Sequence, residues 1–350
     1  MTIQETIEKI KPLSEQAIKL CWQRWDGIAK PLRSLGKLEE AVAQIAGIQQ
    51  TADIHIEKKG LVIMCADNGV VEEGVTQSGQ YVTAVVAENF LDEKSCVAIM
   101  CRHTGTDIFP VDIGMAVDTP RVEKRKIAYG TKNMTKVPAM SREEAVAAIE
   151  AGIAKAEELY KAGYQILATG EMGIGNTTTS SAMTAVFLDV PVAEVTGRGA
   201  GLSTEGLNRK VSAIERAIVL HHPDKNDPID VLSKVGGFDI AGLAGVFLGG
   251  AACKMPVVAD GFISMVAALT AVKIAPECTP YIITSHLSKE PAAHLLYEAL
   301  DKEAFLTCDM HLGEGRGAVA LFPMLDLAAE IYHKMSTFDE AHFEVYHPLV

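Results

Sequence analysis

The sequence predicts an α/β fold, in which a three-layer, open parallel sheet of the Rossmann-like type is joined to a small helical domain. Two observations predict the sheet. Apolar runs typical of buried strands alternate with helical patterns through the middle of the 350-residue chain. Polar residues also collect directly after the predicted strands, at Asp67, Glu171, Arg198, Asp260 and His286. Open parallel sheets bind ligands beyond the carboxyl ends of their strands, so we expect the functional site there.

The helical domain is predicted from the two chain ends. The N-terminal segment shows apolar residues at helical spacing and no strand pattern, and Pro12 divides it into successive helices. A last long helix is expected over residues 318–335. We therefore expect a small helical domain from residues 1–55 and 325–350, and an α/β nucleotide-binding catalytic domain from 56 to 324.

The elements of the sheet domain follow from short apolar runs and helix signals. Residues 60–66 (GLVIMCA) form a continuous apolar run, which is typical of a strand buried on both faces. Further strands are expected at 107–113, 164–167, 192–195, 257–259, 280–284 and 305–308. Helices are expected at 82–91, 182–188, 204–222, 238–253 and 262–274, and after the capping box of Ser141 and Glu144. The polar segment 123–135 is expected to be a surface excursion.

Charge and composition exclude several classes of function. The net charge of −13 argues against binding to nucleic acid or to an anionic membrane. The longest apolar stretch, residues 238–253, contains Asp239 and four glycines and is too short to span a membrane. The N-terminus lacks the apolar core of a secretory signal. The seven cysteines are scattered without a CxxC pair, which predicts a reducing, cytoplasmic location with no disulfide or zinc site.

One glycine-rich stretch is the first candidate for a ligand site. Residues 168–181 (ATGEMGIGNTTTSS) place a turn between a predicted strand and a helix start crowded with hydroxyl groups. Gly173 and Gly175 allow close approach of the backbone, and free amides at a helix N-terminus favour a phosphate. The stretch matches neither GxGxxG nor a Walker A motif, and a capped helix start remains the alternative. Glu171 conflicts with a simple phosphate site, because its carboxylate would repel the ligand.

Three further stretches carry candidate chemistry. Residues 197–210 again place glycines and hydroxyls before a helix, and two such loops at neighbouring strand ends favour one anion-binding crevice. Residues 312–317 (LGEGRG) set Glu314 between glycines, as either an exposed turn residue or a partly buried general base with a raised pKa. Residues 285–291 contain His, Ser and Glu but no nucleophile elbow, which favours a hydrogen-bonded turn over a catalytic triad.

In combination with residues 260–263, these stretches resemble the nicotinate-nucleotide–dimethylbenzimidazole phosphoribosyltransferase family, from about residue 20 to the C-terminus. The resemblance implies that nicotinate mononucleotide donates its 5-phosphoribosyl group to 5,6-dimethylbenzimidazole or a related base. The products would be α-ribazole 5′-phosphate and nicotinate, with inversion at C1′. A homodimer is also implied. Because nicotinate leaves from a pyridinium-type bond, the implied reaction needs neither a metal nor a cofactor.

The resemblance also implies roles for individual residues. Glu314 matches the general base of the family, and Glu171 and Lys210 match charged residues near the ribose and the phosphate. The nucleotide would be bound by Gly173, Gly175, Asn176, Thr177, Thr178, Gly199 and Gly201. The base would contact Thr76, Gln80 and Leu312.

Two other classes remain open from the sequence. A nicotinamide-dependent dehydrogenase is favoured by Glu194, which lies at about the spacing expected of a ribose-binding acid. The missing third glycine and the hydroxyl residues after Asn176 argue against it. A non-catalytic nucleotide sensor would keep the phosphate loops but would not need a carboxylate between glycines.

Overall fold

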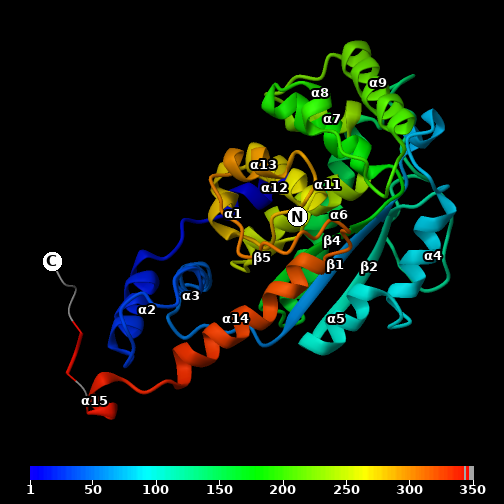
Figure 1. Cartoon of the computed structure of the whole chain (residues 1–350). Helices are drawn as coiled ribbons and strands as arrows, with labels where there is room; N and C mark the ends of the chain where they lie inside the picture. Colours follow the sequence, from blue (N-terminus) through cyan, green and yellow to red (C-terminus); the bar gives the residue numbers. More distant parts are fainter. Residues whose placement is uncertain (343, 347–350) are drawn as a thin grey trace.

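The computed structural model describes residues 1–342 and 344–346, which contain a six-stranded sheet in which every paired strand is parallel to its neighbour. The strand order is β3-β2-β1-β4-β5-β6 (Figure 1). The chain therefore builds one half of the sheet outward from β1, returns to the centre, and builds the other half from β4. This doubly wound topology confirms the predicted α/β class and creates a ligand-binding crevice where the order reverses.

The central strands are long and buried. The strands are β1 (Lys59–Ala66), β2 (Thr106–Gly114), β3 (Glu123–Lys124), β4 (Ile166–Met172), β5 (Val257–Ala259) and β6 (Ile282–Thr284). Every residue of β1 is buried, as expected for a strand covered on both faces. Glu171 pairs with Met64 of β1 and is the second-last residue of β4. The sequence predicted that this strand ends at Leu167, but β4 continues five residues further, to Met172.

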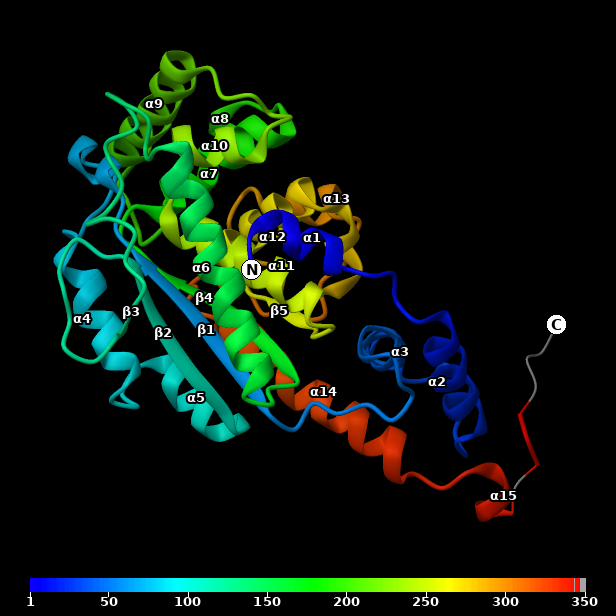
Figure 2. The same ribbon diagram turned by 180° about the vertical axis from the view of Figure 1, so that it is seen from behind.

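Helices cover both faces of the sheet (Figures 1 and 2). The α-helices are α1 (Ile3–Lys9), α2 (Glu15–Gly27), α3 (Lys37–Gln49), α4 (Tyr81–Phe90), α5 (Cys96–Thr104), α6 (Arg142–Lys161), α7 (Asn176–Leu188), α8 (Val192–Val195), α9 (Thr204–His221), α10 (Pro228–Val235), α11 (Phe238–Ala252), α12 (Phe262–Ile274), α13 (Ala293–Ala299), α14 (Arg316–Lys334) and α15 (Phe338–Ala341). Two 3₁₀ helices, η1 (Gly69–Glu73) and η2 (Pro276–Tyr281), complete the set.

Alternate residues of β1 feed two separate hydrophobic clusters. Val62 and Met64 belong to the cluster that includes α6, α11 and α12. Leu61 and Ile63 belong to the cluster that includes α3, α4, α5 and α14. Successive side chains of a strand point to opposite faces, so this division defines the three layers that the sequence predicts.

Three sequence predictions of local structure were wrong. Residues 192–195 form the short helix α8, not a strand; Pro191 precedes it, and a four-residue apolar run cannot distinguish a strand from a buried helix. Residues 305–308 form no strand and contribute only a bridge between Leu306 and His286. The polar segment 123–135 begins with the edge strand β3. Consequently the loop before α9 follows a helix rather than a neighbouring strand.

Segments near the two ends of the chain, α2 and the region of α14 and α15, meet beside the sheet. Arg24 of α2 donates from Nε to the carbonyl of Tyr332 in α14 at 3.2 Å, and the rings of Trp25 and Tyr332 pack together. Ile28 and Thr337 form an antiparallel bridge. The first helix, α1, instead packs on α6 and α11 (Figure 2). The division into a helical and a catalytic domain remains a prediction. No helix among the described residues is both long enough and apolar enough to cross a membrane.

Glycines allow α6 and α11 to pack unusually closely. A Cβ on Gly245 would overlap the carbonyl oxygen of Ile149, and a Cβ on Gly152 would overlap that of Gly242. The overlapping atoms belong to helix backbones, which cannot yield as a side chain does. The absence of side chains at these positions therefore fixes the distance between the two helices.

We predict that Gly245→Ala destabilises the protein by about 1–3 kcal/mol, because the added methyl group forces α6 and α11 apart. Gly27→Ala is the matched control, since a Cβ on Gly27 meets no atom within 4 Å. We expect it to change stability by less than about 0.5 kcal/mol. Urea unfolding of both variants measures the difference. Equal stability of Gly245→Ala and the unmodified protein would show that the helices are free to separate.

Candidate active site

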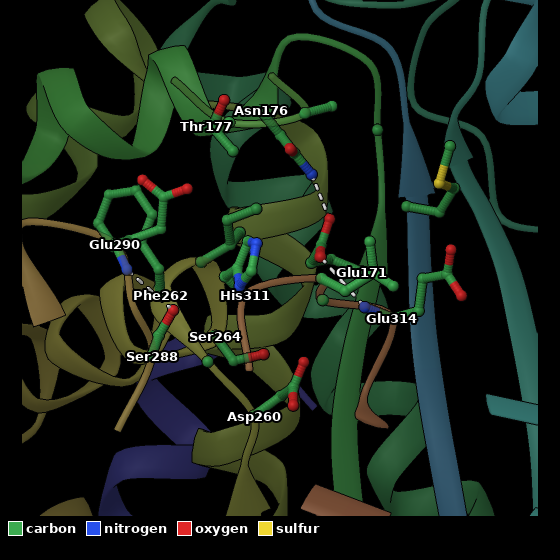
Figure 3. A pocket seen from close by; sticks show the side chains of 18 of the residues that line it. Glu171, Asn176, Thr177, Asp260, Phe262, Ser264, Ser288, Glu290, His311 and Glu314 are labelled. Atoms are coloured by element: carbon green, nitrogen blue, oxygen red, sulfur yellow. Dashed lines mark hydrogen bonds between the residues drawn. The ribbon is translucent and has the colours of Figure 1, made fainter. Parts of the chain in front are cut away.

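A cavity of about 240 Å³ lies at the carboxyl edge of the sheet (Figure 3). Its walls come from the end of β4, the start of α7, and the loops that precede α9, α12 and α14. Seven of the predicted site residues line it: Glu171, Gly173, Asn176, Thr177, Gly199, Leu312 and Glu314. The stretch predicted to bind the phosphoribosyl donor (residues 168–181, the donor loop) and the stretch predicted to bind the acceptor base (residues 312–317, the acceptor loop) therefore share one cavity.

A smaller cavity of about 100 Å³ adjoins the first, because both are lined by Asn176 and Thr177. Two more predicted residues, Thr76 and Gly175, lie in its wall. Four predicted residues line neither cavity: Gln80, Thr178, Gly201 and Lys210. Thr178 is fully buried, and Gln80 donates to the carbonyl of Asn68 at 3.2 Å.

Lys210 joins the two glycine-rich loops from behind. Its Nζ donates to Thr177 Oγ1 at 2.9 Å and to the carbonyl of Gly197 at 3.1 Å. A Cβ on Gly199, which has a φ of +53°, would lie 2.9 Å from the same Thr177 oxygen. Burial lowers the pKa of Lys210 to about 8, and the nearby Glu290 carboxylate opposes that shift. The two loops therefore meet, although only one of them follows a strand.

Glu171 connects the donor loop to the acceptor loop. Its carboxylate accepts a hydrogen bond from Nδ2 of Asn176, and its Oε1 accepts a weak one from the backbone amide of Glu314 at 3.3 Å (Figure 3). Burial raises the pKa of Glu171 to about 8, and the Asp239 carboxylate raises it further while Asn176 lowers it. The carboxylate that conflicted with a phosphate site thus stands between the two loops.

The backbone around Glu314 is left-handed at three successive residues. The φ angles of Gly313, Glu314 and Gly315 are +75°, +63° and +89°. A Cβ on Gly313 would overlap Oε1 of Glu171, so glycine is required there for contact as well as for conformation. Glu314 itself adopts a conformation that is costly for a residue with a side chain, and such strain is concentrated at functional sites.

The Glu314 carboxylate is mostly buried and forms an ion pair with Arg316. Burial raises the pKa of this carboxyl group, while the guanidinium of Arg316 lowers it. The raised pKa is the property that the sequence predicted for a general base. The contact with Arg316 involves Oε2 of Glu314, and a carboxylate that accepts a proton gives up the charge on which this ion pair depends.

Asp260, at the end of β5, anchors the acceptor loop. Its Oδ2 accepts from the amide of Gly315 at 3.0 Å, and its Oδ1 accepts from Gly317 at 2.7 Å and Ala318 at 3.2 Å. These are free amides at the start of α14, which a carboxylate satisfies both by hydrogen bonds and by its charge. The sequence placed Asp260 after a strand but gave it no role.

Sequence reasoning missed Asp239 as a site residue. This residue of α11 is fully buried, and its Oδ2 accepts from Asn176 Nδ2 at 2.9 Å. The signal was present, because Asp239 is the charged residue in an otherwise apolar, glycine-rich helix. The turn after β6 contributes further wall residues, His286, Ser288 and Glu290. The amide of Glu290 donates to Ser288 Oγ at 3.3 Å, as expected of a hydrogen-bonded turn.

Comparison with known proteins identifies the class of this fold and site. The model of a family described as phosphoribosyltransferase matches residues 10–343. The chain belongs to this family, and the protein is an enzyme of the pentosyl-transferring class. This result decides against the dehydrogenase and the non-catalytic sensor that the sequence left open.

The named relatives make the family more specific. The nicotinate-nucleotide–dimethylbenzimidazole phosphoribosyltransferase of Acetivibrio thermocellus is 48% identical over 348 residues, with 99% of each chain covered. That of Ruminiclostridium cellulolyticum is 49% identical over 351 residues, with 100% of each chain covered. A crystal structure of the Thermus thermophilus enzyme of this name has a TM-score of 0.88 and 36% identity, and covers 95% of this chain and 99% of that one. The chain is a member of the nicotinate-nucleotide–dimethylbenzimidazole phosphoribosyltransferase family.

We predict that Asp260→Ala frees the acceptor loop. Removal of the cap is expected to cost about 1–2 kcal/mol and to speed hydrogen exchange at Gly315, Gly317 and Ala318. Asp227→Ala is the matched control, because Asp227 caps α10 through the amides of Ile229 and Asp230. It should lose similar stability without faster exchange in the loop. Unchanged exchange in Asp260→Ala would contradict the anchoring role.

Proposed function

We propose that this enzyme transfers the 5-phosphoribosyl group of nicotinate mononucleotide to 5,6-dimethylbenzimidazole or a related base, giving α-ribazole 5′-phosphate and nicotinate. The observation that carries the proposal is the shared cavity, in which the glycine–hydroxyl loop and the Gly-Glu-Gly loop face one space. The names of the relatives support the choice of substrates.

The donor phosphate binds at the start of α7. The helix dipole at this N-terminus favours an anion, and Gly173 and Gly175 let the phosphate approach the backbone closely, although the amide of Asn176 itself donates to the carbonyl of Gly173 at 3.2 Å. The Thr177 hydroxyl and the Gly199 loop complete the phosphate site. Lys210 supports them from behind, because its hydrogen bonds hold Thr177 against the loop and its charge compensates the phosphate.

Glu171 faces the sugar. In nicotinate mononucleotide the bond from C1′ runs to a pyridinium nitrogen, so the donor is already cationic at the reacting centre. As that bond lengthens, the positive charge moves onto the ribose. Burial holds the pKa of Glu171 at about 8, and in its ionised form the buried carboxylate stabilises this charge more strongly than it would in water.

Glu314 activates the acceptor. One ring nitrogen of the imidazole attacks C1′ from the face opposite the nicotinate, while the other nitrogen gives its proton to the Glu314 carboxylate. The bond from C1′ to the pyridinium nitrogen breaks, and its electron pair returns to the nicotinate ring. Attack from the opposite face inverts C1′ and yields the α linkage. Leu312, which is exposed beside Glu314, offers an apolar contact for the flat base.

We also propose that the protein is a cytoplasmic homodimer, as the family resemblance implies. The seven free cysteines, of which four are fully buried side chains, support a reducing compartment. Tyr81 and Val85, two large apolar residues exposed one helical turn apart on α4, support a partner surface.

The direct test of the function is a two-substrate assay. The protein is mixed with nicotinate mononucleotide and 5,6-dimethylbenzimidazole in the presence of a metal chelator, and nicotinate and α-ribazole 5′-phosphate are measured. We expect both products, and no nicotinate when the base is omitted. Failure to release nicotinate with any benzimidazole would refute the proposal.

We predict that Glu314→Gln folds and binds nicotinate mononucleotide, but loses about 10²- to 10⁴-fold in turnover because the amide accepts no proton. Glu194→Gln is the matched control, since Glu194 is exposed and outside the cavity, and its turnover should be unchanged. Steady-state rates of nicotinate release compare the two. A near-normal rate for Glu314→Gln would remove its assignment as the base.

We predict that Lys210→Met, which keeps most of the side-chain volume, weakens the binding of nicotinate mononucleotide by about tenfold or more, because it removes the hydrogen bonds to Thr177 and Gly197 and the buried positive charge behind the phosphate site. Lys225→Met serves as the control, because Lys225 is half exposed and pairs with Asp189 on the surface. Calorimetric titration gives both affinities. Equal affinities would contradict a role of Lys210 in holding the phosphate.

A further inference from the structure

Asn176 donates from one amide group to two buried carboxylates. Its Nδ2 contacts Glu171 at the end of β4 and, at 2.9 Å, Oδ2 of Asp239 in the first turn of α11. Asp239 is fully buried and Glu171 is nearly so. Two carboxylates that were both ionised would repel each other strongly in such a dry environment.

The surroundings supply acids rather than cations. In residues 1–342 and 344–346, neither Glu171 nor Asp239 takes part in an ion pair. The Asp260 carboxylate, at the end of β5, raises the pKa of Glu171, and the Asp67 carboxylate, which follows β1, raises the pKa of Asp239. The Cys65 thiol of β1 also lies near both carboxylates.

The remaining charged groups nearby are already engaged. Arg316, on the acceptor loop, is paired with Glu314. His286 lies 3.9 Å from Asp260 and not against the pair. Burial in this set of acids raises the pKa of Glu171 to about 8 and that of Asp239 to about 6.

The second oxygen of Asp239 has no hydrogen bond partner among the described residues, and neither has Oδ1 of Asn68. These two oxygens lie 2.5 and 2.8 Å from the position that a Cβ on Gly237 would take. Both are buried acceptors at one place. The two oxygens are thus at most 5.3 Å apart, the sum of these distances, and a proton carried on this oxygen of Asp239 would have an acceptor without a donor in its neighbourhood.

We propose that Asp239 is a positioning residue of the phosphoribosyl site, which orients Asn176 and shares a single proton with Glu171, so that the two carboxylates together carry one negative charge at neutral pH. The catalytic consequence rests on the proposed function. One charge beside C1′ suits a donor that carries one positive charge at its pyridinium nitrogen. Asp239 does not contact that donor and acts through Asn176 and Glu171.

The sign of the pH dependence follows from the raised pKa. Below about pH 8 the pair keeps its proton, and above it both carboxylates ionise. The affinity for the cationic end of the donor should therefore rise as the pH rises through 8. If Asp239 is made neutral, the repulsion disappears, and Glu171 should ionise at a lower pH.

Infrared spectroscopy of the full-length protein without substrate tests the shared proton. A protonated carboxyl group absorbs infrared light at a different frequency from an ionised carboxylate. The spectrum at pH 7 should contain one protonated carboxyl group that is absent from Glu171→Gln, whichever of the two residues holds the proton, because an unpaired Asp239 would ionise. No difference between the two proteins would overturn the proposal, and this outcome does not depend on any activity.

The variant Asp239→Asn tests the positioning residue itself. The asparagine can still accept from Asn176, so the change removes charge and keeps the contact. We expect the midpoint of the Glu171 infrared titration to fall by about one pH unit or more, and the pH midpoint of kcat/KM to fall with it. Asp112→Asn is the matched control. Asp112, on β2, is also fully buried, but its carboxylate contacts the amide of Met115 and the ammonium group of Lys126. It should leave both midpoints in place.

The outcomes separate this inference from the function. An unmoved Glu171 midpoint in Asp239→Asn contradicts the shared proton, even if nicotinate is released normally. If the midpoint moves in Asp239→Asn but the unmodified protein releases no nicotinate, the shared proton is supported and the phosphoribosyl transfer is refuted. Asp239→Leu, which removes the acceptor as well as the charge, should lower kcat more than Asp239→Asn does. Equal rates in those two variants would remove the role in orienting Asn176.

Discussion

The site depends on one buried carboxylate at the end of a central strand. Glu171 accepts hydrogen bonds from the side chain of Asn176, the first residue of α7, and from the backbone amide of Glu314, in the loop before α14. These two segments lie 138 residues apart, the difference between positions 314 and 176. Burial of an acid without a cation is unfavourable, and the structure offsets this cost with amide donors and with protonation. The same arrangement holds the donor loop and the acceptor loop against one cavity.

The doubly wound sheet makes this arrangement available. The smaller cavity lies where the strand order reverses, between residues 75–78 after β1 and residues 173–177 after β4. The larger cavity continues from there over the ends of β4, β5 and β6. Asp260, at the end of β5, then fixes the acceptor loop through three backbone amides. Lys210 fixes the donor side through Thr177. Each anchor is a buried polar group that bonds backbone or hydroxyl groups, so the positions of the loops around the cavity are determined before a ligand binds.

Much of the fold follows from local sequence, and the limits of prediction have physical causes. The continuous apolar run of β1 and the alternation of strands with helices sufficed for the parallel sheet. The Gly-Glu-Gly motif left Glu314 as either an exposed turn residue or a partly buried base, and the structure shows that its side chain is mostly buried. The run at 192–195 was misassigned because its hydrophobicity reports burial and not conformation. The end of β4 was missed because Gly170 and Glu171 are unusual in a strand, and here a Cβ on Gly170 would overlap the carbonyl oxygen of Glu314.

Contacts between distant segments were beyond local pattern. Asn176 and Asp239 are 63 residues apart, and no periodicity connects them. Lys210 looked like an exposed helix cation, yet it is fully buried behind the cavity wall. The measurement that most directly tests the account is the configuration at C1′ of the isolated product, determined by proton NMR. If the donor loop and Glu314 act from opposite sides of the ribose, the product is the α anomer. A β anomer would contradict that arrangement.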